Sequence, residues 1–296
     1  MATNTHRSLL PLLLKTPPGQ LKNVYTDIKG ILSVGDELDK SARAIFEQHN
    51  HEQLAVVYIN VEGAEVPVII AQAARTPSGR YVSRRFSLSF AFDHVRVAAS
   101  DVLPHAPLSG LAKELDEQLD KYVGDHYEMS ASGVFQQEAD EEPVEEPSGE
   151  GEAPEASARD DECPSPLIIH IVGNRYNLRN FWSGRWRSTY TYDPNAKTFT
   201  SAIIRVQAHY FEGGNVQLNT HNTTIPQLKE GAVSAAQLIG AIASHEQAYQ
   251  ESLDVTIESL RERAFRTLRR TLPFTKQKID WDKAVGYKIG NELQGR

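Results

Sequence analysis

Residues 265–296 carry the side chains of this sequence best suited to binding another molecule. They include eight Lys or Arg and three Asp or Glu, a local net charge of +5 (8 − 3). Trp281, Val285 and Ile289 recur every four residues, which places them on one face of a short helix. Two glycines inside this helix each cost about 1 kcal/mol relative to alanine, so we expect it to order on a partner. The predicted binding residues are Arg266, Arg269, Arg270, Lys276, Lys278, Trp281, Val285 and Ile289.

The same tail admits other interpretations. An amphipathic helix lying on a membrane surface would use the same basic and aromatic side chains. A solvated basic helix end would bind nothing. A nucleic-acid interface would need a larger basic face, and we favour an arm that docks on a protein surface.

No group of residues in the sequence predicts catalysis. Asp125 and His126 invite a catalytic interpretation, but no nucleophile motif accompanies them, so we expect a structural hydrogen bond instead. Cys163 is the single cysteine, which excludes an internal disulfide and favours a reducing compartment. It follows an acidic stretch, where an exposed free thiol is a better interpretation than a nucleophile. We therefore predict a protein that is not an enzyme and needs no cofactor.

A histidine-rich helix end raises the question of a metal. His49 and His51 lie close in sequence to Glu47 and Glu52, and all four residues offer ligand atoms. Their spacing does not match a zinc-helix motif of the HExxH type. We therefore expect a solvated helix end and no metal site.

The element that must position the arm is a long helix. Ser234 is a candidate N-cap, and Pro273 ends the helix by forcing Leu272 out of helical geometry. A helix of roughly 38 residues is roughly 57 Å long, whereas a compact domain of this chain's size is about 50 Å across. It is either a core helix with a frayed end or a helix shared with a second subunit, and we favour the latter. Its apolar stripe consists of Ala235, Ile239, Ile242, Tyr249, Leu253, Ile257, Leu260, Ala264 and Leu268.

The charge of the chain is concentrated in one stretch. The formal net charge is −8, and residues 138–162 hold twelve acidic residues and one Arg, a net −11. The remainder is therefore +3 (−8 + 11). The acidic stretch is too polar to order itself, and we expect it to extend the tip of a β-hairpin. The apolar run Leu9–Leu14 is too short for a signal peptide, and no run is long enough to span a membrane, so we predict a cytoplasmic protein.

The rest of the chain predicts an α+β fold. Helical spacing covers three short N-terminal segments and residues 108–127, whereas period-two alternation indicates antiparallel strands between 54 and 92 and between 167 and 218. The predicted organisation is a helical stalk (1–52), strands and a helix of a globular body (53–136), a disordered acidic insertion (137–166), a central antiparallel sheet (167–230), the long helix (231–272) and the amphipathic arm (273–296).

Two of the three tryptophans lie within five residues of each other. Alternation along a strand places Trp182 and Trp186 on one face and Arg185 and Arg187 on the other. Such a strand could be a stacking platform for nucleic acid, but a buried aromatic wall at a sheet or subunit interface is the better interpretation.

Three segments together resemble one protein family. They are Asn-Phe-Trp-Ser-Gly-Arg-Trp-Arg-Ser at 180–188, His-Tyr-Phe-Glu-Gly-Gly-Asn-Val-Gln-Leu at 209–218, and the run from Arg269 through Leu272-Pro273 to Trp281. In this order they resemble the F-actin capping protein alpha subunit. Three features depart from the family pattern. Tyr190 stands where a tryptophan is expected, Lys276 stands where an arginine is usual, and the family has only a short connection in place of the acidic insertion.

The resemblance implies a subunit that forms a heterodimer with a capping protein beta subunit. Such a dimer blocks subunit addition and loss at the barbed ends of actin filaments without severing them. Its antiparallel sheet continues across the dimer, with long C-terminal helices over the sheet. We expect the subunit interface to include Trp182, Arg185, Trp186, Tyr210, Ile257 and Leu260.

The resemblance also assigns roles within the arm. Arg266, Arg270 and Lys276 match the principal actin-contacting positions, and Arg269 and Lys278 support them. Phosphoinositides compete for this arm in the family, and capping-protein regulators are further expected partners. The location that follows is the cortical actin cytoskeleton. The alternative function is a peripheral membrane or phosphoinositide-binding protein.

Overall fold

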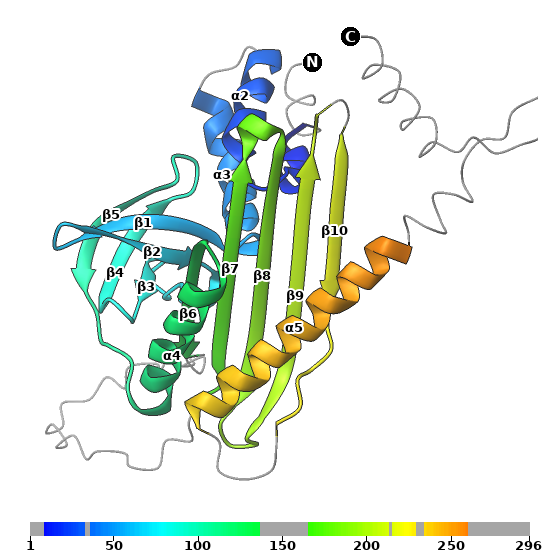
Figure 1. Cartoon of the computed structure of the whole chain (residues 1–296). Helices are drawn as coiled ribbons and strands as arrows, with labels where there is room; N and C mark the ends of the chain where they lie inside the picture. The colour runs from blue at the N-terminus through cyan, green and yellow to red at the C-terminus, as the bar shows by residue number, and fades with distance from the viewer. Residues whose placement is uncertain (1–8, 33–35, 137–164, 213–214, 229–233, 260–296) are drawn as a thin grey trace, which may run out of the picture. The chain divides into compact units, whose positions relative to one another are not determined.

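The computed structural model of the chain describes residues 9–32, 36–136, 165–212, 215–228 and 234–259 (Figure 1). The chain divides into two compact units, Met1–Ala243 and Ser244–Arg296. Among the described helices, none has the long, nearly uncharged apolar stretch that a bilayer crossing requires.

The first unit begins with three helical segments, as the sequence predicts. They are the 3-10 helix η1 (Leu10–Lys15) and the α-helices α2 (Leu21–Leu32) and α3 (Asp36–Glu52). Pro11 is tolerated because it lies in the first turn of η1, where the backbone N–H that proline lacks would have no acceptor within the helix. The three segments share a small core in which the rings of Tyr25 and Phe46 meet edge to face, with centroids 4.9 Å apart.

Two small antiparallel sheets follow the helices. Strands β1 (Ala55–Val61) and β2 (Ala64–Ile70) form a hairpin, and β3 (Tyr81–Ser83), β4 (Leu88–Asp93) and β5 (Ala98–Pro104) form a three-stranded sheet. The sequence analysis did not predict β5. Its residues lack an apolar–polar alternation, and nearly all of them are exposed, so it pairs with β4 through its backbone without a buried face of its own.

The largest sheet has five antiparallel strands in the order β10-β9-β8-β7-β6. The strands are β6 (Met129–Gln136), β7 (Leu167–Asn177), β8 (Trp182–Asp193), β9 (Thr198–Tyr210) and β10 (Val216–Asn222). Gln136 and Leu167 are direct register partners, so β6 and β7 are the two arms of one hairpin on either side of residues 137–166. This pairing confirms the predicted hairpin around the acidic stretch.

One face of this sheet is covered by helices (Figure 1). Helix α4 (Gly110–His126) contributes Leu115 and Leu119, which pack with Ile169 and Tyr190 of the sheet. The first turns of α5 (Ala235–Ser259) add Ala235, Leu238 and Ile242 to the same core. The opposite face of β6 and β7 packs against β1 and β2 through Ala131, Phe135 and Val172. Alternation along the strands therefore supplies apolar residues to both faces.

The start of α5 follows its sequence signal. The Gln237 N–H donates to Ser234 Oγ (3.4 Å), and the Ser234 N–H donates to Gln237 Oε1 (2.9 Å). This reciprocal pair is a capping box; the Gln237 N–H also donates to the Ser234 carbonyl (3.1 Å). It confirms Ser234 as the N-cap. The predicted continuation of the helix to Leu272 lies outside the described residues.

Candidate functional site

The predicted arm lies entirely outside the described residues. This applies to Arg266, Arg269, Arg270, Lys276, Lys278, Trp281, Val285 and Ile289, and also to Leu260 of the predicted interface. The described part of the chain does contain the other predicted interface residues. They lie on β8, on β9 and in the second unit.

The aromatic residues of β8 and β9 meet at one end of the sheet. Trp182 and Tyr210 are direct register partners, and both tryptophans of β8 are half-buried. The guanidinium of Arg175 lies over the Trp182 ring, 5.7 Å from its centroid. Trp186 donates its indole N–H to Ser188 Oγ (2.8 Å), and the Tyr210 hydroxyl, on a side chain 45% exposed, donates to Glu212 (2.6 Å). The described part of the chain thus leaves this aromatic group partly exposed.

The two arginines of β8 point to the other face, as alternation predicts. Arg185 donates to Asn174 Oδ1 (2.8 Å) and to Gln53 Oε1 (3.2 Å). Arg187 is buried and donates to the carbonyl of Glu52 and to Gln207 Oε1 (2.9 Å). Burial lowers the pKa of Arg187 to about 9, and the nearby charge of Arg185 acts in the same direction. Within this chain, both arginines attach the end of α3 to the sheet.

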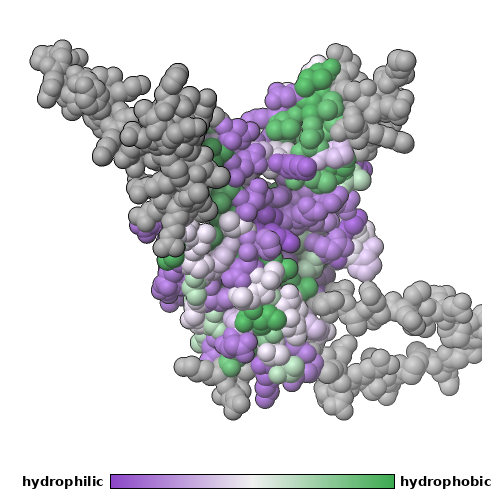
Figure 2. Space-filling model, turned by 90° about the vertical axis from the view of Figure 1, so that its right-hand side faces the viewer, coloured by the Kyte–Doolittle hydropathy of each residue, from purple (hydrophilic) through white to green (hydrophobic). Residues whose placement is uncertain are grey.

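Strand β10 forms one edge of the five-stranded sheet. It pairs with β9 on one side, and Val216 at its start is 61% exposed. Figure 2 faces this side of the molecule and shows a mainly hydrophilic surface with a hydrophobic patch near its upper end. An edge strand presents unpaired backbone N–H and C=O groups, which are the groups that a further strand would use for pairing.

The second unit begins within α5. In its outer turns the side chains of Val255 and Ile257 are 69% and 48% exposed. Ile257 belongs to the predicted apolar stripe, whereas Val255 does not. The described residues therefore leave Ile257 of the stripe about half exposed.

One side of the end of α3 is buried, and this corrects the expectation of a solvated helix end. His49, Asn50 and Gln53 are only 6%, 2% and 6% exposed. The end of the helix is buried because the β8 arginines bind the backbone of residues 52–53, while the turn after β4 packs on Asn50. Burial lowers the pKa of His49 to about 4, and Arg185 contributes in the same direction.

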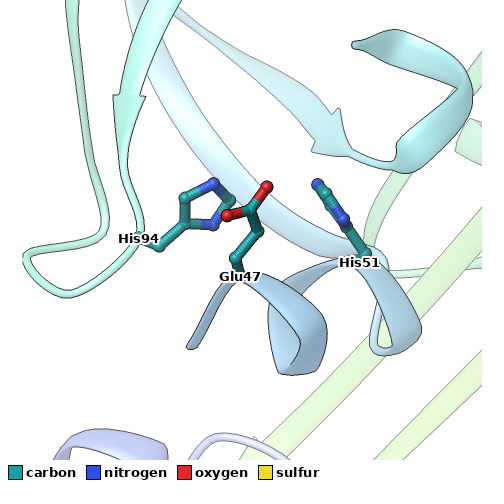
Figure 3. Close-up of side chains that lie close together, drawn as sticks. All are labelled: Glu47, His51 and His94. Atoms are coloured by element: carbon teal, nitrogen blue, oxygen red, sulfur yellow. The ribbon is translucent and has the colours of Figure 1, made fainter. Parts of the chain in front are cut away.

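This burial brings together two distant histidines and a glutamate. Glu47 and His51 are one turn apart on α3, and His94 follows the end of β4 (Figure 3). One ligand atom from each of the three lies within 4.8 Å of the other two. The Tyr81 hydroxyl completes the group, because it lies 2.5 Å from His51 Nε2 and 3.0 Å from His94 Nε2.

Burial of this group of side chains determines their protonation states. Desolvation lowers the pKa of His94 to about 4 and also lowers the pKa of His51. Desolvation raises the pKa of Tyr81 to about 12. At neutral pH both imidazoles are therefore neutral and the phenol is protonated. Sequence spacing could not reveal the group, because His94 is 43 positions from His51 and only the fold brings them together.

In the Asp125–His126 pair, the histidine bonds to the backbone of its own helix. His126 is at the end of α4, and its Nδ1 donates to the carbonyl of Tyr122 (2.8 Å). The predicted structural hydrogen bond is therefore present, with a backbone carbonyl as its acceptor.

Comparison with known proteins decides the family. A sequence profile of the F-actin capping protein alpha subunit matches residues 10–292, nearly the whole chain. The chain belongs to the F-actin capping protein alpha subunit family. The resemblance seen in the three sequence segments is thus confirmed.

Family members from distant organisms align along almost their entire length. The Neurospora crassa F-actin-capping protein subunit alpha is 34% identical over 98% of this chain and 97% of its own. The Caenorhabditis elegans protein of the same name is 29% identical, over 94% of this chain and 93% of its own.

A solved structure of the family supports the fold. The homodimeric actin capping protein alpha subunit from Plasmodium berghei superposes with a TM-score of 0.68 at 15% identity. The match covers 94% of this chain and 100% of that one. At this identity the likeness concerns the fold, and it agrees with the α+β architecture described above.

Proposed function

We propose that this chain is the alpha subunit of a heterodimer that caps the barbed ends of actin filaments. The dimer would block both addition and loss of actin subunits there, without severing filaments. The observation that carries this proposal is the near full-length match to the family profile, residues 10–292. Capping is a binding function, and we propose neither catalysis nor a cofactor requirement for it.

The edge of the sheet supports a partner subunit. Strand β10 ends the five-stranded sheet among the described residues, so a strand of a beta subunit could extend the sheet by pairing along this edge. The neighbouring Tyr210 and Val216 are 45% and 61% exposed, and they would be buried by such an extension. We assign Trp182, Trp186 and Tyr210 to this interface.

The outer turns of α5 support the same conclusion. Ile257 is 48% exposed in the chain alone, although it belongs to an apolar stripe that would otherwise be expected to face a core. Complete burial of one such side chain contributes roughly 1.5–3 kcal/mol. We propose that Ile257 and Leu260 pack on the partner subunit.

The C-terminal arm would make the contact with actin in two steps. Its basic residues would first attract an acidic surface, because exposed ion pairs contribute only about 0.2–1 kcal/mol each and mainly steer association. Trp281, Val285 and Ile289 would then dock, with roughly 1.5–3 kcal/mol available from each. Neither contribution alone reaches the roughly 12 kcal/mol of a nanomolar complex after the cost of ordering the arm.

The same arm is the proposed target of regulation. Phosphoinositides would compete with actin for Arg266, Arg269 and Arg270, and other regulators would act on the dimer at cortical actin in the cytoplasm. Binding to lipid would then be part of the control of capping. The protein is first co-sedimented with phosphoinositide vesicles in the absence of actin, and filament ends are then added. Release of the protein from the vesicles by filament ends would support regulation of capping, whereas vesicle binding that filament ends do not affect would indicate a separate membrane function.

The test is elongation of actin from preformed filament seeds. The full chain is co-expressed with a capping protein beta subunit, and the purified complex is added at concentrations near that of the filament ends. We expect barbed-end growth and shrinkage to stop while the number of filaments stays constant. A stable complex that leaves both rates unchanged would contradict the proposal, and a rise in filament number would contradict the absence of severing.

A further inference from the structure

We propose that Glu47, His51 and His94 form a binding site for a divalent transition-metal ion, with Zn²⁺ as the best fit. The site is independent of the proposed capping function. It lies in the first unit, between the end of α3 and the turn after β4, and none of its residues belongs to the predicted arm or the predicted subunit interface.

The donor set matches the chemistry of zinc. Two imidazole nitrogens and one carboxylate oxygen are a common set of three protein ligands for zinc, with a fourth position left open. Two imidazole nitrogens disfavour magnesium and calcium, which prefer oxygen ligands. The three donor atoms are within 4.8 Å of one another, so small side-chain movements bring all three to a central ion at bonding distance.

The local fold holds these donors in place. Glu47 and His51 are four residues apart on α3, so both side chains project from the same face of the helix. His94 is held by Asn50, whose side-chain amide lies 3.3 Å from His94 Nδ1 and 3.2 Å from the His94 carbonyl oxygen. The bond to the carbonyl oxygen fixes the turn after β4 on α3 and so holds the His94 ring beside Glu47 and His51.

The Tyr81 hydroxyl lies where the ion would bind. It is within hydrogen-bond distance of Nε2 of both histidines, so an oxygen bridges the two donors in the metal-free chain. In the metal-bound state the ion would take this position, and the displaced tyrosine oxygen or a water would be the fourth ligand. Binding through Nε2 places the ring proton of His94 on Nδ1, so the Asn50 N–H must move away from Nδ1 while it keeps its bond to the His94 carbonyl oxygen.

Protonation does not oppose metal binding at neutral pH. Both imidazoles are neutral there because burial lowers their pKa values, and neutral imidazole is the form that binds a metal. The competing cation is Arg75, whose Nη1 lies 2.7 Å from Glu47 Oε1. The Arg75 side chain is 38% exposed, so it can turn into solvent, and Glu47 Oε2 remains available to the ion.

A bound ion would cross-link two parts of the first unit. Helix α3 belongs to the N-terminal helical core, whereas His94 follows β4 of the three-stranded sheet. Metal that binds only the folded state stabilises that state, and the stabilisation grows with the logarithm of the metal concentration once this exceeds the dissociation constant. We therefore expect a structural role, with added zinc raising the temperature of unfolding.

The proposal is tested by titrating the full chain, together with any subunit that co-purifies with it, after removal of metals with a chelator. Calorimetry with Zn²⁺ measures binding, and Co²⁺ reports tetrahedral coordination through its visible absorption bands. We expect one equivalent to bind, and we expect Glu47→Gln and His51→Gln each to weaken binding at least 10-fold. His126→Gln is the matched control, because that imidazole is exposed at the end of α4 and bonds to the Tyr122 carbonyl, away from the proposed site.

Each outcome bears on the site. Loss of binding in the two site variants but not in His126→Gln would support the assignment, provided that their unfolding without metal resembles that of the intact chain. If the intact chain binds no Zn²⁺ or Co²⁺, the cluster is a hydrogen-bond network only and the proposal is overturned. If the site variants bind as tightly as the intact chain, the metal lies elsewhere and the assignment is wrong.

Discussion

Arg85 and Asp116 form a two-pronged ion pair that joins the loop between β3 and β4 to helix α4. Arg85 Nε lies 2.6 Å from Asp116 Oδ2, and Arg85 Nη2 lies 2.8 Å from Oδ1. The same Oδ1 also accepts the backbone N–H of Val134 in β6 (3.2 Å). Asp116 is 4% exposed, so one buried carboxylate connects three parts of the first unit.

Replacing Asp116 by alanine should strongly destabilise the chain. Removing the buried carboxylate leaves the largely buried Arg85 guanidinium with the exposed Asp120 as its carboxylate partner, at a cost of up to about 3–5 kcal/mol. Asp120 is the matched control, since it also pairs with Arg85 but its side chain is 63% exposed. Asp120→Ala should cost less than about 1 kcal/mol. Urea unfolding of both variants measures the difference, and equal losses would show that the buried pair has no special role.

Replacing Gly173 by alanine should also destabilise the chain. A Cβ built there would lie 2.4 Å from Tyr127 Cδ1, so Gly173→Ala must displace the ring or the strand. We expect a loss of about 1–3 kcal/mol in the free energy of unfolding. Gly184→Ala, on the neighbouring strand, is the control, because its nearest contact would be 3.7 Å. A Gly173→Ala variant as stable as Gly184→Ala would rule out this steric account.

His170 should make the stability of the fold depend on pH. It is buried beside Thr189, and burial lowers its pKa from 6.5 to about 4. The folded state therefore favours the neutral ring, whereas the unfolded chain takes up a proton below pH 6.5. Its contribution is complete above pH 6.5 and is lost as the pH falls toward 4, on the order of 3 kcal/mol in total.

The measurement compares the intact chain with His170→Asn, whose amide can take the position of Nδ1. Between pH 7 and pH 5 we expect the variant to lose about 2 kcal/mol less of its free energy of unfolding than the intact chain loses. His126→Asn, at an exposed histidine, should lose as much as the intact chain. The same loss in His170→Asn as in the intact chain would disprove the role of His170.

Periodicity in the sequence was enough to predict most of the fold. The strand around Trp186 was predicted because it alternates, and the N-cap at Ser234 was predicted because the serine precedes an apolar helical stripe. Strand β5 was missed because its exposed residues carry no pattern, and its pairing with β4 depends on backbone groups that every sequence has.

The histidine cluster shows a second limit of prediction from sequence. His51 and Glu47 were visible as possible ligands, but the buried state of the helix end depends on Arg185 and Arg187, more than 130 positions later. The local composition predicted a helix end exposed to solvent, whereas in the fold strand β8 and the turn after β4 pack against it. His94 could be paired with His51 only once the turn after β4 had been placed on α3.

The outer part of α5 offers a test of the partner subunit. Ile257→Asp should reduce co-purification of a beta subunit, because a charge would replace an apolar side chain assigned to the interface, and at least about 2 kcal/mol of burial would be lost. Val255→Asp is the control. It introduces the same charge at a residue that is more exposed, 69% against 48%, and that lies off the predicted stripe. Equal effects of the two substitutions, or no effect of either, would contradict the predicted interface.

The most direct test of the central claim is removal of the arm. A chain ending at Phe265, co-purified with a beta subunit, is compared with the full chain in elongation of actin from filament barbed ends. Our account predicts that the truncated complex remains a soluble heterodimer and no longer slows barbed-end growth. Capping by the truncated complex at the same concentrations as the intact complex would contradict the account.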